Sequence, residues 1–488
     1  MRHLYIIAIV FLFGGFLSCT DFLEENPKGT LTDANFYKTE ADAEAAVVAA
    51  YDGLNDQWNI YFRGIYLLAE LPTDNAECGI GVANAQIWAL DGYTHGPVND
   101  RIQVLYQSLY QTISNANVAV DNIAGIDFNQ QKKERLIGEA RFVRALLYFN
   151  LVRLFGGVPL ELHQVSDLNN VSLAKSSVED IYKQIIEDLK YGQQHLDDVN
   201  SSSNRGRATS IAATGLLAKV YLTIGENENA RIEAKKIIDY AGTEYGLLES
   251  YYDMFTPENR YNKEFIFAVQ NKGYTGTANG FALALFLPRA TIPLPGGGEV
   301  NGNSADVPTE EFYNSFKSGD TRRDRTFFTQ YDAGAGLVTF RPHWYKFFDP
   351  SVIANLGEGT LNYPVIRYAD ILLTYAEAIN ELNGPTPEAC EAVNKVRRRA
   401  YGKNIDTGDP STDISGLSKE QFQDIILDER RWEFGFENHR WFDLVRTGKL
   451  LTVLRAKGLN INDHNILFPF PQREIDTNKN LVQNPDYK

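Results

Sequence analysis

The densest group of side chains that could do chemistry is the stretch 428–444, which reads DERRWEFGFENHRWFDL, in a chain of 488 residues. Carboxylates and a histidine this close together could transfer protons, and a catalytic interpretation assigns that work to Glu429, Glu433 or His439. The same spacing also suits a helix with charged and aromatic groups on one face. Residue types alone therefore leave a catalytic and a structural interpretation of this stretch.

The structural interpretation joins the charges of the 428–444 stretch in ion pairs. Glu429, Glu433 and Arg440 would pair over the flat rings of Trp432 and Trp441, because guanidinium groups stack on aromatic faces. Clusters of perturbed charges are often architectural networks. We favour this interpretation and expect no catalytic residue in the stretch.

A second group of side chains could bind a sugar. Recognition of a pyranose ring needs a flat apolar surface for its carbon–hydrogen face and polar groups for its hydroxyls. Segments without a helical pattern offer both kinds of side chain, and we expect stacking from aromatic residues and hydrogen bonds from Asp74 and Asn301. The six predicted ligand-binding residues are Asp74, Trp88, Tyr93, Tyr274, Asn301 and Trp344.

Each of these six residues also has a plain structural interpretation. Trp88 lies among Ile87, Ala89 and Leu90 and would suit a hydrophobic core. The run 343–348 around Trp344 could equally be packing. The prediction therefore depends on which of these side chains reach the surface.

Sequence signatures of enzymes are missing from the chain. We find no GxSxG, HExxH, P-loop, GxGxxG after a strand or EF-hand loop, and the seven histidines have no metal-ligand spacing. Carboxylate pairs are plentiful, but none is marked as the pair of a glycosidase. The sequence predicts a protein that is not an enzyme, with no cofactor and no metal site.

Composition and charge narrow the classes of partner. Lys and Arg number 47 against 63 Asp and Glu, and the formal charge of −16 argues against nucleic acid and against adhesion to an anionic membrane. Aromatic residues make up 12% of the chain, with Tyr unusually frequent. Only Cys78 and Cys390 lie outside the amino-terminal region, and we expect no disulfide.

The amino terminus carries an export signal. Met1–His3 is short and basic, residues 4–13 are nearly all apolar, and the sequence Leu17-Ser18-Cys19 is typical of a bacterial lipobox. We therefore expect residues 1–18 to be a lipoprotein signal peptide, Cys19 to be lipidated, and residues 19–35 to form a tether. The alternative is an ordinary signal peptide with a chance cysteine.

Helical periodicity organises two parts of the chain. Amphipathic helices are expected from a cap at Thr39 onward, between 132 and 155 before Gly156-Gly157, after Ser177, and from 208 to 240. The same pattern returns at 369–396 and after a capping box at Ser418. About four helix pairs joined by short turns can be counted, as in tetratricopeptide-type repeats.

Between these two parts, the helical pattern fades from about 241 to 362, where glycines are frequent and Phe265–Val269 could be a strand. We expect one composite domain over 36–488. Its helical scaffold covers mainly 36–240 and 363–450, and an irregular, ligand-facing layer covers mainly 55–100 and 241–362.

Several separated motifs resemble one known family. The chain resembles the RagB/SusD family of Bacteroidetes outer-membrane lipoproteins at motifs that keep their order along nearly the whole mature chain. The matching segments are residues 139–145, Tyr148, 156–159, 363–373, 376–378, 393–397, 429–446, 468–475, Asn478, Asn484, Pro485 and Tyr487.

This resemblance implies a mainly α-helical SusD-like fold, with four tetratricopeptide-like helix pairs carrying an irregular layer and a few short strands. It implies a lipid anchor on the outer face of the outer membrane. It also implies that the protein sits as a lid on a SusC-like TonB-dependent transporter. In this role the protein itself captures oligosaccharides. Ligand-binding loops vary within the family, so no binding residue is carried over.

Three other functions remain open from the sequence. A RagB-like protein would take up peptides in place of oligosaccharides, and a surface glycoside hydrolase would cleave what it binds. Helix pairs could also serve only as an assembly scaffold, since such repeats commonly bind proteins through a concave face. We favour non-catalytic oligosaccharide capture.

Overall fold

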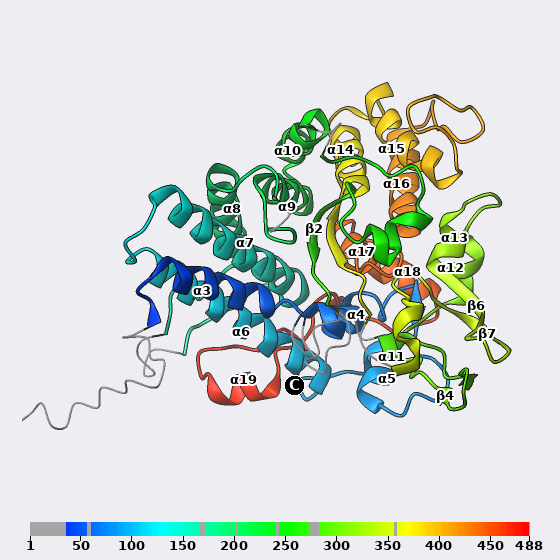
Figure 1. Cartoon of the computed structure of the whole chain (residues 1–488), viewed down its shortest axis with the longest axis horizontal. Coiled ribbons are helices and arrows are strands. Elements are labelled where there is room, and N and C mark those ends of the chain that lie inside the picture. Colours follow the sequence, from blue (N-terminus) through cyan, green and yellow to red (C-terminus); the bar gives the residue numbers. More distant parts are fainter. Residues whose placement is uncertain are drawn as a thin grey trace, which may run out of the picture.

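The computed structural model describes most of the chain after residue 35 (Figure 1). The described residues are 36–55, 60–165, 172–201, 204–240, 244–272, 283–355 and 359–487. Long helices dominate, and the strands among these residues are short.

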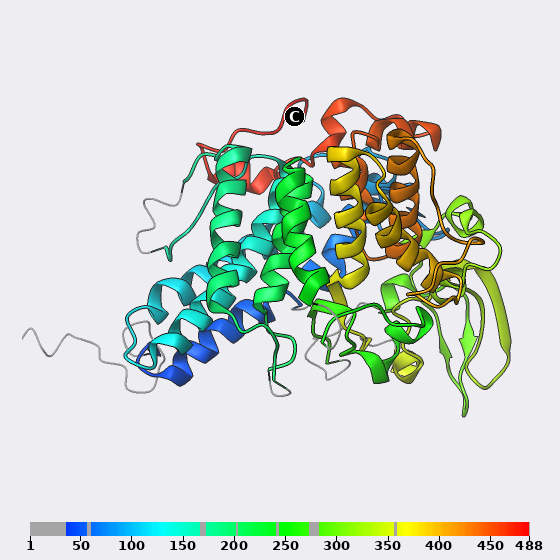
Figure 2. The same ribbon diagram turned by 90° about the horizontal axis from the view of Figure 1, so that it is seen from above.

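Long antiparallel helices lie side by side in chain order across the molecule (Figures 1 and 2). Four contacting pairs make up the predicted scaffold, namely α3 with α6, α7 with α8, α9 with α10, and α14 with α15. These eight helices, with α16 packed against α14, have the following bounds: α3 (Glu40–Asp52), α6 (Asp100–Ile123), α7 (Gln130–Phe155), α8 (Val178–His195), α9 (Ser210–Thr223), α10 (Asn227–Tyr240), α14 (Tyr368–Asn383), α15 (Pro387–Ala400) and α16 (Lys419–Phe434).

The helices begin and end where the sequence predicts. Thr39 and Asp42 form a capping box at the start of α3, and Ser418 and Gln421 form another at the start of α16. Gly156 ends α7 with a φ of 74°, a conformation that residues with a side chain rarely adopt.

Small residues let α9 pack closely against the strand that contains Ile366 and against α14, which contains Ile371. A side-chain carbon at Gly215 would lie 3.2 Å from Ile366 and 3.4 Å from Ile371. The Ala- and Gly-rich sequence of α9 is therefore explained by close packing against the centre of the molecule.

Each described strand pairs with one other strand, always antiparallel. The predicted strand β2 (Phe265–Val269) is present, and its partner β8 (Tyr363–Arg367) was not predicted because the two are far apart in sequence. The other strands are β1 (Ala76–Glu77), β3 (Ile292–Pro293), β4 (Glu299–Val300), β5 (Val307–Pro308), β6 (Phe327–Asp332) and β7 (Leu337–Trp344).

Short helices lie between and after the long ones, and those within 55–100 and 241–362 occupy the layer that the sequence predicts to be irregular. They are α4 (Ile65–Ala69), α5 (Ala85–Asp91), α11 (Leu283–Phe286), α12 (Glu310–Ser315), α13 (Arg322–Thr326), α17 (Arg440–Arg446), α18 (Leu450–Ala456) and α19 (Gln472–Thr477), with a π-helix at Ile60–Gly64 and 3-10 turns at Tyr252–Phe255, Pro257–Asn259, Pro350–Asn355 and Asp463–Ile466.

The segment from Ile60 to Ala76 differs most from the sequence expectation. We expected a ligand-facing loop there, but nearly all of its side chains are buried in the large hydrophobic core. Tyr66 and Leu68 are fully buried, and Tyr66 packs against Phe286 and Phe436. Local sequence could not reveal this burial, because the covering segments come from distant parts of the chain.

The described residues contain no helix that is both long and apolar enough to cross a membrane. Cys78 and Cys390 are buried free thiols. Cys19, with the signal peptide and tether, lies outside the described residues.

Candidate functional site

Helix α5 and the loop before it present an exposed tryptophan. Trp88 is 43% exposed, and its indole nitrogen donates a 2.8 Å hydrogen bond to the carbonyl oxygen of Val82, which holds the ring in one orientation. Asn84 caps α5, and the backbone N–H of Cys78 donates to the Asp91 carboxylate at 3.0 Å, which closes the loop. Of the four tryptophans that the structure describes, Trp88 is the exposed one.

A second loop of this face carries Asn301. Its side chain is exposed immediately after β4, and the backbone N–H of Gly79 donates a 2.9 Å hydrogen bond to the carbonyl oxygen of Ser304. This bond ties the loop before α5 to the loop after β4, and Figure 1 places α5, α11 and β4 together. We call Ile80, Trp88, Arg289 and Asn301 the α5 face.

The α5 face combines apolar and polar groups. Ile80 is 81% exposed, and the exposed Arg289 lies beside Gly81, where an added side-chain carbon would be 3.2 Å from its Nε. An exposed ring held beside guanidinium and amide donors can offer stacking and hydrogen bonds to a sugar. Sequence reasoning missed Ile80 and Arg289, since no pattern in either segment marks them.

Asp74 is not exposed but lies in a buried ion pair. Arg440 donates to both of its carboxylate oxygens, at 2.8 and 2.7 Å, and Arg431 lies 3.2 Å away. Burial alone would raise the pKa of Asp74, but the hydrogen bond and charge of Arg440 lower it below its usual value. Asp74 thus joins the loop to α17, and its predicted contact with a ligand stays a prediction.

Tyr93 and Trp344 also pack in the interior. The Tyr93 hydroxyl donates to the carbonyl oxygen of Pro72, and its ring stacks on Trp441 with centroids 6.2 Å apart. Trp344 is 3% exposed, and its ring stacks on Phe436 at 4.5 Å. Both residues have structural partners, and their predicted ligand contacts stay predictions. Tyr274 lies outside the described residues.

The 428–444 stretch lies at the centre of the molecule, in a network of buried charges. Glu433 accepts hydrogen bonds from Arg399 at 2.6 Å, Arg367 at 2.9 Å and Arg322 at 3.2 Å. The whole network, which we call the central charge network, pairs five cations with five carboxylates. Its members are Arg322, Lys346, Arg367, Arg397, Arg399, Glu264, Asp320, Glu429, Glu433 and Glu437.

The ion pairs of this stretch confirm the structural interpretation, but the stacking partners differ from those predicted. The Arg367 guanidinium lies 4.7 Å from the ring centroid of Phe434, and Lys317, not an arginine, lies over Trp432. Trp441 is covered by Tyr93. The sequence could not identify Arg322, Arg367 or Lys346 as partners, because the fold brings them from outside the stretch.

The arginines around Glu433 favour the ionised state of its carboxylate. Burial would raise the pKa of Glu433, but the charges of Arg399, Arg367 and Arg322 lower it to about 2. Burial lowers the pKa of Lys346 to about 8 against the opposing charge of Glu437. A carboxylate this acidic makes a poor general acid or base at neutral pH.

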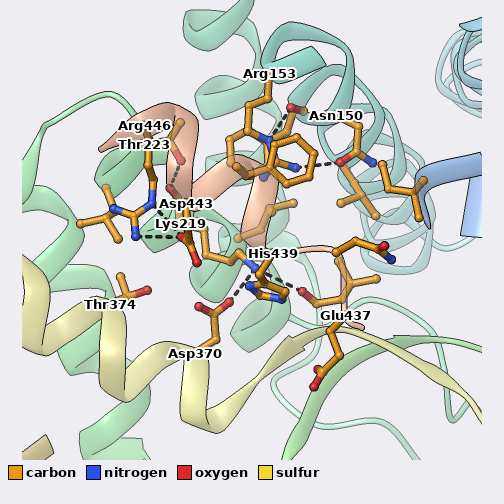
Figure 3. A pocket seen from close by; sticks show the side chains of 18 of the residues that line it. Asn150, Arg153, Lys219, Thr223, Asp370, Thr374, Glu437, His439, Asp443 and Arg446 are labelled. Atoms are coloured by element: carbon orange, nitrogen blue, oxygen red, sulfur yellow. Dashed lines mark hydrogen bonds and ion pairs between the residues drawn. The ribbon is translucent and has the colours of Figure 1, made fainter. Parts of the chain in front are cut away.

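A small cavity of about 50 Å3 lies beside the network (Figure 3). Figure 3 shows charged side chains from α9, α14 and α17 converging on it. Lys219 lies 2.6 Å from Asp370, and Arg446 lies 2.8 Å from Asp443. Because ligand pockets for small molecules measure about 300 Å3 or more and one water takes about 30 Å3, this cavity suits water and not a sugar ring.

His439, the histidine of the catalytic interpretation, lies beside the same cavity. Burial lowers its pKa well below the usual range, and the nearby charge of Lys219 lowers it further. Its Nδ1 lies 3.3 Å from a guanidinium nitrogen of Arg430. The His439 ring also stacks on Phe434, with ring centroids 4.4 Å apart, so its contacts are those of a packed side chain.

A contact between a serine and a histidine resembles the nucleophile–base pair of a hydrolase. Ser304 Oγ lies 2.9 Å from His343 Nε2, and Ser304 has a positive φ of 49°. His343 Nδ1, however, bonds the carbonyl oxygen of Arg341 and no carboxylate, and burial lowers the His343 pKa to about 4. Ser304 is buried and accepts the N–H of Arg289 at 2.7 Å, so the contact fastens a loop to β7.

The described residues contain no group of three or more histidine, cysteine or acidic side chains that could hold a metal ion.

Comparison with known proteins places the chain in a family. The SusD family profile matches residues 335–487, and a profile described as starch-binding and associating with the outer membrane matches residues 21–222. SusD-like protein P2 of Formosa agariphila is 30% identical, and the alignment covers 99% of each chain. The chain belongs to the SusD family.

Two further relatives of this SusD-family protein bind known glucans. Starch-binding protein SusD of Bacteroides thetaiotaomicron is 24% identical, over 100% of this chain and 99% of that one. The solved structure of a laminarin-binding SusD-like protein is 26% identical, with a TM-score of 0.78, and covers 92% of this chain and all of the other. Both the predicted family and the predicted fold class are confirmed.

Residues of the recognised SusD-family motifs lie in the central charge network. Arg367 belongs to the 363–373 motif, and Glu433 and Glu437 belong to the 429–446 motif. In this protein the motifs therefore describe the interior architecture and not the α5 face. This explains how the sequence could identify the family without identifying a ligand.

Proposed function

We propose that this SusD-family protein is a non-catalytic cell-surface lipoprotein that captures oligosaccharides with its α5 face. One observation carries the proposal. Among the described residues, Trp88 is the exposed tryptophan. The hydrogen bond from its indole nitrogen to Val82 fixes the orientation of the ring, while the ring stays accessible to solvent. Relatives that bind starch and laminarin support a glucan as the ligand class.

Within this proposal, the ring of Trp88 stacks on the carbon–hydrogen face of a sugar. Asn301 and Arg289 lie on the neighbouring loops and supply hydrogen bonds to hydroxyl groups. Residues 36–488 act as one domain, in which the helical scaffold holds this face rigid. The buried ion pairs and the buried Ser304 argue for binding without cleavage.

The anchor and the transporter complete the proposal. Cys19 carries the lipid, and the bound oligosaccharide passes to a SusC-like TonB-dependent transporter in the outer membrane. A Cys19→Ala variant should fold and bind oligosaccharide in solution but fail to localise to the outer membrane. Loss of oligosaccharide binding by that purified variant would contradict the anchoring role.

An oligosaccharide panel tests the central function. Purified protein is incubated with malto-oligosaccharides and laminari-oligosaccharides, and both binding and released products are measured. We expect retention of at least one glucan with no change in its length. Release of shorter products would instead support a glycoside hydrolase, and binding of peptides without glycans would support a RagB-like role.

A further inference from the structure

A groove beside β2 contains two arginines for which the described residues provide no acidic partner. Arg205 follows α8, and Arg260 precedes β2; their guanidinium carbons lie 5.3 and 5.2 Å from the ring centroid of Tyr261. No described carboxylate lies within 4.0 Å of either guanidinium, and neither group donates a hydrogen bond to a described residue. Tyr261 itself is 44% exposed.

This arrangement places guanidinium groups on the surface of an acidic chain. Acidic residues outnumber basic ones by 63 to 47, and exposed arginines such as Arg231 and Arg323 are paired, with Glu228 and Asp324 respectively. Arg207, in the same groove, is paired with Glu44 and Glu139. Arg205 and Arg260 therefore keep their donors available, and the Tyr261 ring holds them together.

Two adjoining cavities, which only together exceed the volume of about 300 Å3 typical of a small-molecule pocket, give this groove room for a ligand. One, of about 120 Å3, is lined by both arginines, Tyr261 and the single carboxylate Glu244. The other, of about 250 Å3, shares the wall formed by Gly206, Phe267 and Gln270. Its lining is mainly apolar, with Val48 and Leu54, and includes the carboxylate of Asp52. Val48, Tyr51 and Asp52 of α3 line the second cavity, so the groove reaches the first helix of the scaffold.

The chemistry of the two cavities is complementary. A guanidinium presents a planar fork of donors that matches a carboxylate or a sulfate. An apolar cavity next to it can accept the carbon–hydrogen face of a sugar ring. Three guanidinium groups line the first cavity against one carboxylate, and Arg207 is already paired with Glu44 and Glu139. Arg205 and Arg260 therefore leave this cavity with a net positive charge.

We propose that this groove is a binding subsite for an acidic saccharide, whose carboxylate or sulfate group lies between Arg205 and Arg260 and whose ring enters the apolar cavity. The proposal rests on the proposed function, because it adds a charged sugar to the oligosaccharides that the protein captures. It assigns the subsite to residues that are separate from the α5 face.

Calorimetric titration with matched pairs of oligosaccharides tests the proposal. One pair is an oligogalacturonide and its methyl ester, and the other is a sulfated carrageenan oligosaccharide and its desulfated form. We expect one acidic member to bind about tenfold or more tightly than its neutral counterpart, and the preference to weaken at high salt. The pair that discriminates identifies carboxylate or sulfate as the recognised group.

Two variants locate the effect. Arg205→Gln combined with Arg260→Gln should abolish the acidic preference and leave the thermal unfolding temperature unchanged. The matched control is Arg323→Gln, which removes an exposed arginine that lies 5.9 Å from Tyr313 but is paired with Asp324. This control should keep the preference.

Equal binding within both pairs, no binding of either acidic member, or an unchanged preference in the double variant would overturn the proposal. A neutral glucan separates this failure from failure of the proposed function. If Trp88→Ala weakens binding of the neutral glucan while no acidic preference exists, only the acidic subsite is wrong. If no oligosaccharide binds at all, the proposed function fails as well.

Discussion

The central charge network and the α5 face differ in how many partners each side chain has. Arg367 contacts Glu264, Glu433 and Glu437 and is 1% exposed. Among the described residues the side chain of Trp88 has one hydrogen-bond partner, and it is 43% exposed. A side chain with many buried partners cannot change without leaving one of them uncompensated. An exposed side chain with one partner can be substituted at little cost in stability, so its identity can follow the ligand that the protein binds.

Removal of a central cation should have the largest effect on stability. Arg367→Met leaves three buried carboxylates with one cationic partner fewer, and breaking a buried ion pair costs about 3–5 kcal/mol. Urea denaturation of the variant and the wild type measures this loss. Arg323→Met removes an exposed pair and should cost less than about 1 kcal/mol.

Equal stability of the two arginine variants would break the comparison, because it would mean that buried and exposed pairs contribute alike.

Acid should weaken the same network. The pKa of Glu433 is about 2 in the folded protein and near 4.5 in an unfolded chain, so its stabilising contribution is complete above pH 4.5 and is lost as the pH falls toward 2. The lowered pKa corresponds to a loss of roughly 3 kcal/mol. Denaturation midpoints measured between pH 7 and 2.5 follow this change.

A free energy of unfolding that stays constant below pH 4.5 would contradict the depressed pKa of Glu433.

A change at Trp88 should affect binding and not stability. Trp88→Ala removes the stacking ring and should weaken glucan binding by about 1 kcal/mol or more, while the free energy of unfolding changes by less than about 0.5 kcal/mol. Calorimetric titration and thermal unfolding measure the two quantities. The buried Trp344 is the matched control, since Trp344→Phe should lower stability and leave the affinity unchanged.

The reverse pattern, with affinity lost in Trp344→Phe and kept in Trp88→Ala, would place the ligand away from the α5 face.

Asn301→Ala should have the smallest effect. An exposed amide that donates one hydrogen bond to a sugar contributes about 0.5–1.5 kcal/mol to binding and little to folding. Titration with the same glucan measures this difference. An increase in affinity would show that Asn301 hinders the ligand.

The contrast between the two regions also explains what the sequence could predict. Periodicity and caps located α3, α7, α8 and α16, because these signals are local. The β8 partner of β2 and the distant cations around Glu433 could not be predicted, because long-range packing brings them together.

The same limit applies to the candidate site. Trp88 and Asn301 are exposed, whereas Asp74, Tyr93 and Trp344 are buried. All five are aromatic or polar residues in segments without a clear helical pattern, so residue type could not separate them. Exposure depends on the distant segments that cover Ile60–Ala76 and β7, such as α17 and Phe436.

Hydroxyl-radical footprinting with and without a bound glucan tests the central claim most directly, because it reports the solvent exposure of individual side chains in one experiment. Ligand contact at the α5 face predicts that the oxidation of Trp88 falls when laminarihexaose or a malto-oligosaccharide is bound, while residues 429–446 stay unchanged. Unchanged oxidation of Trp88, with protection of residues 429–446, would contradict the account.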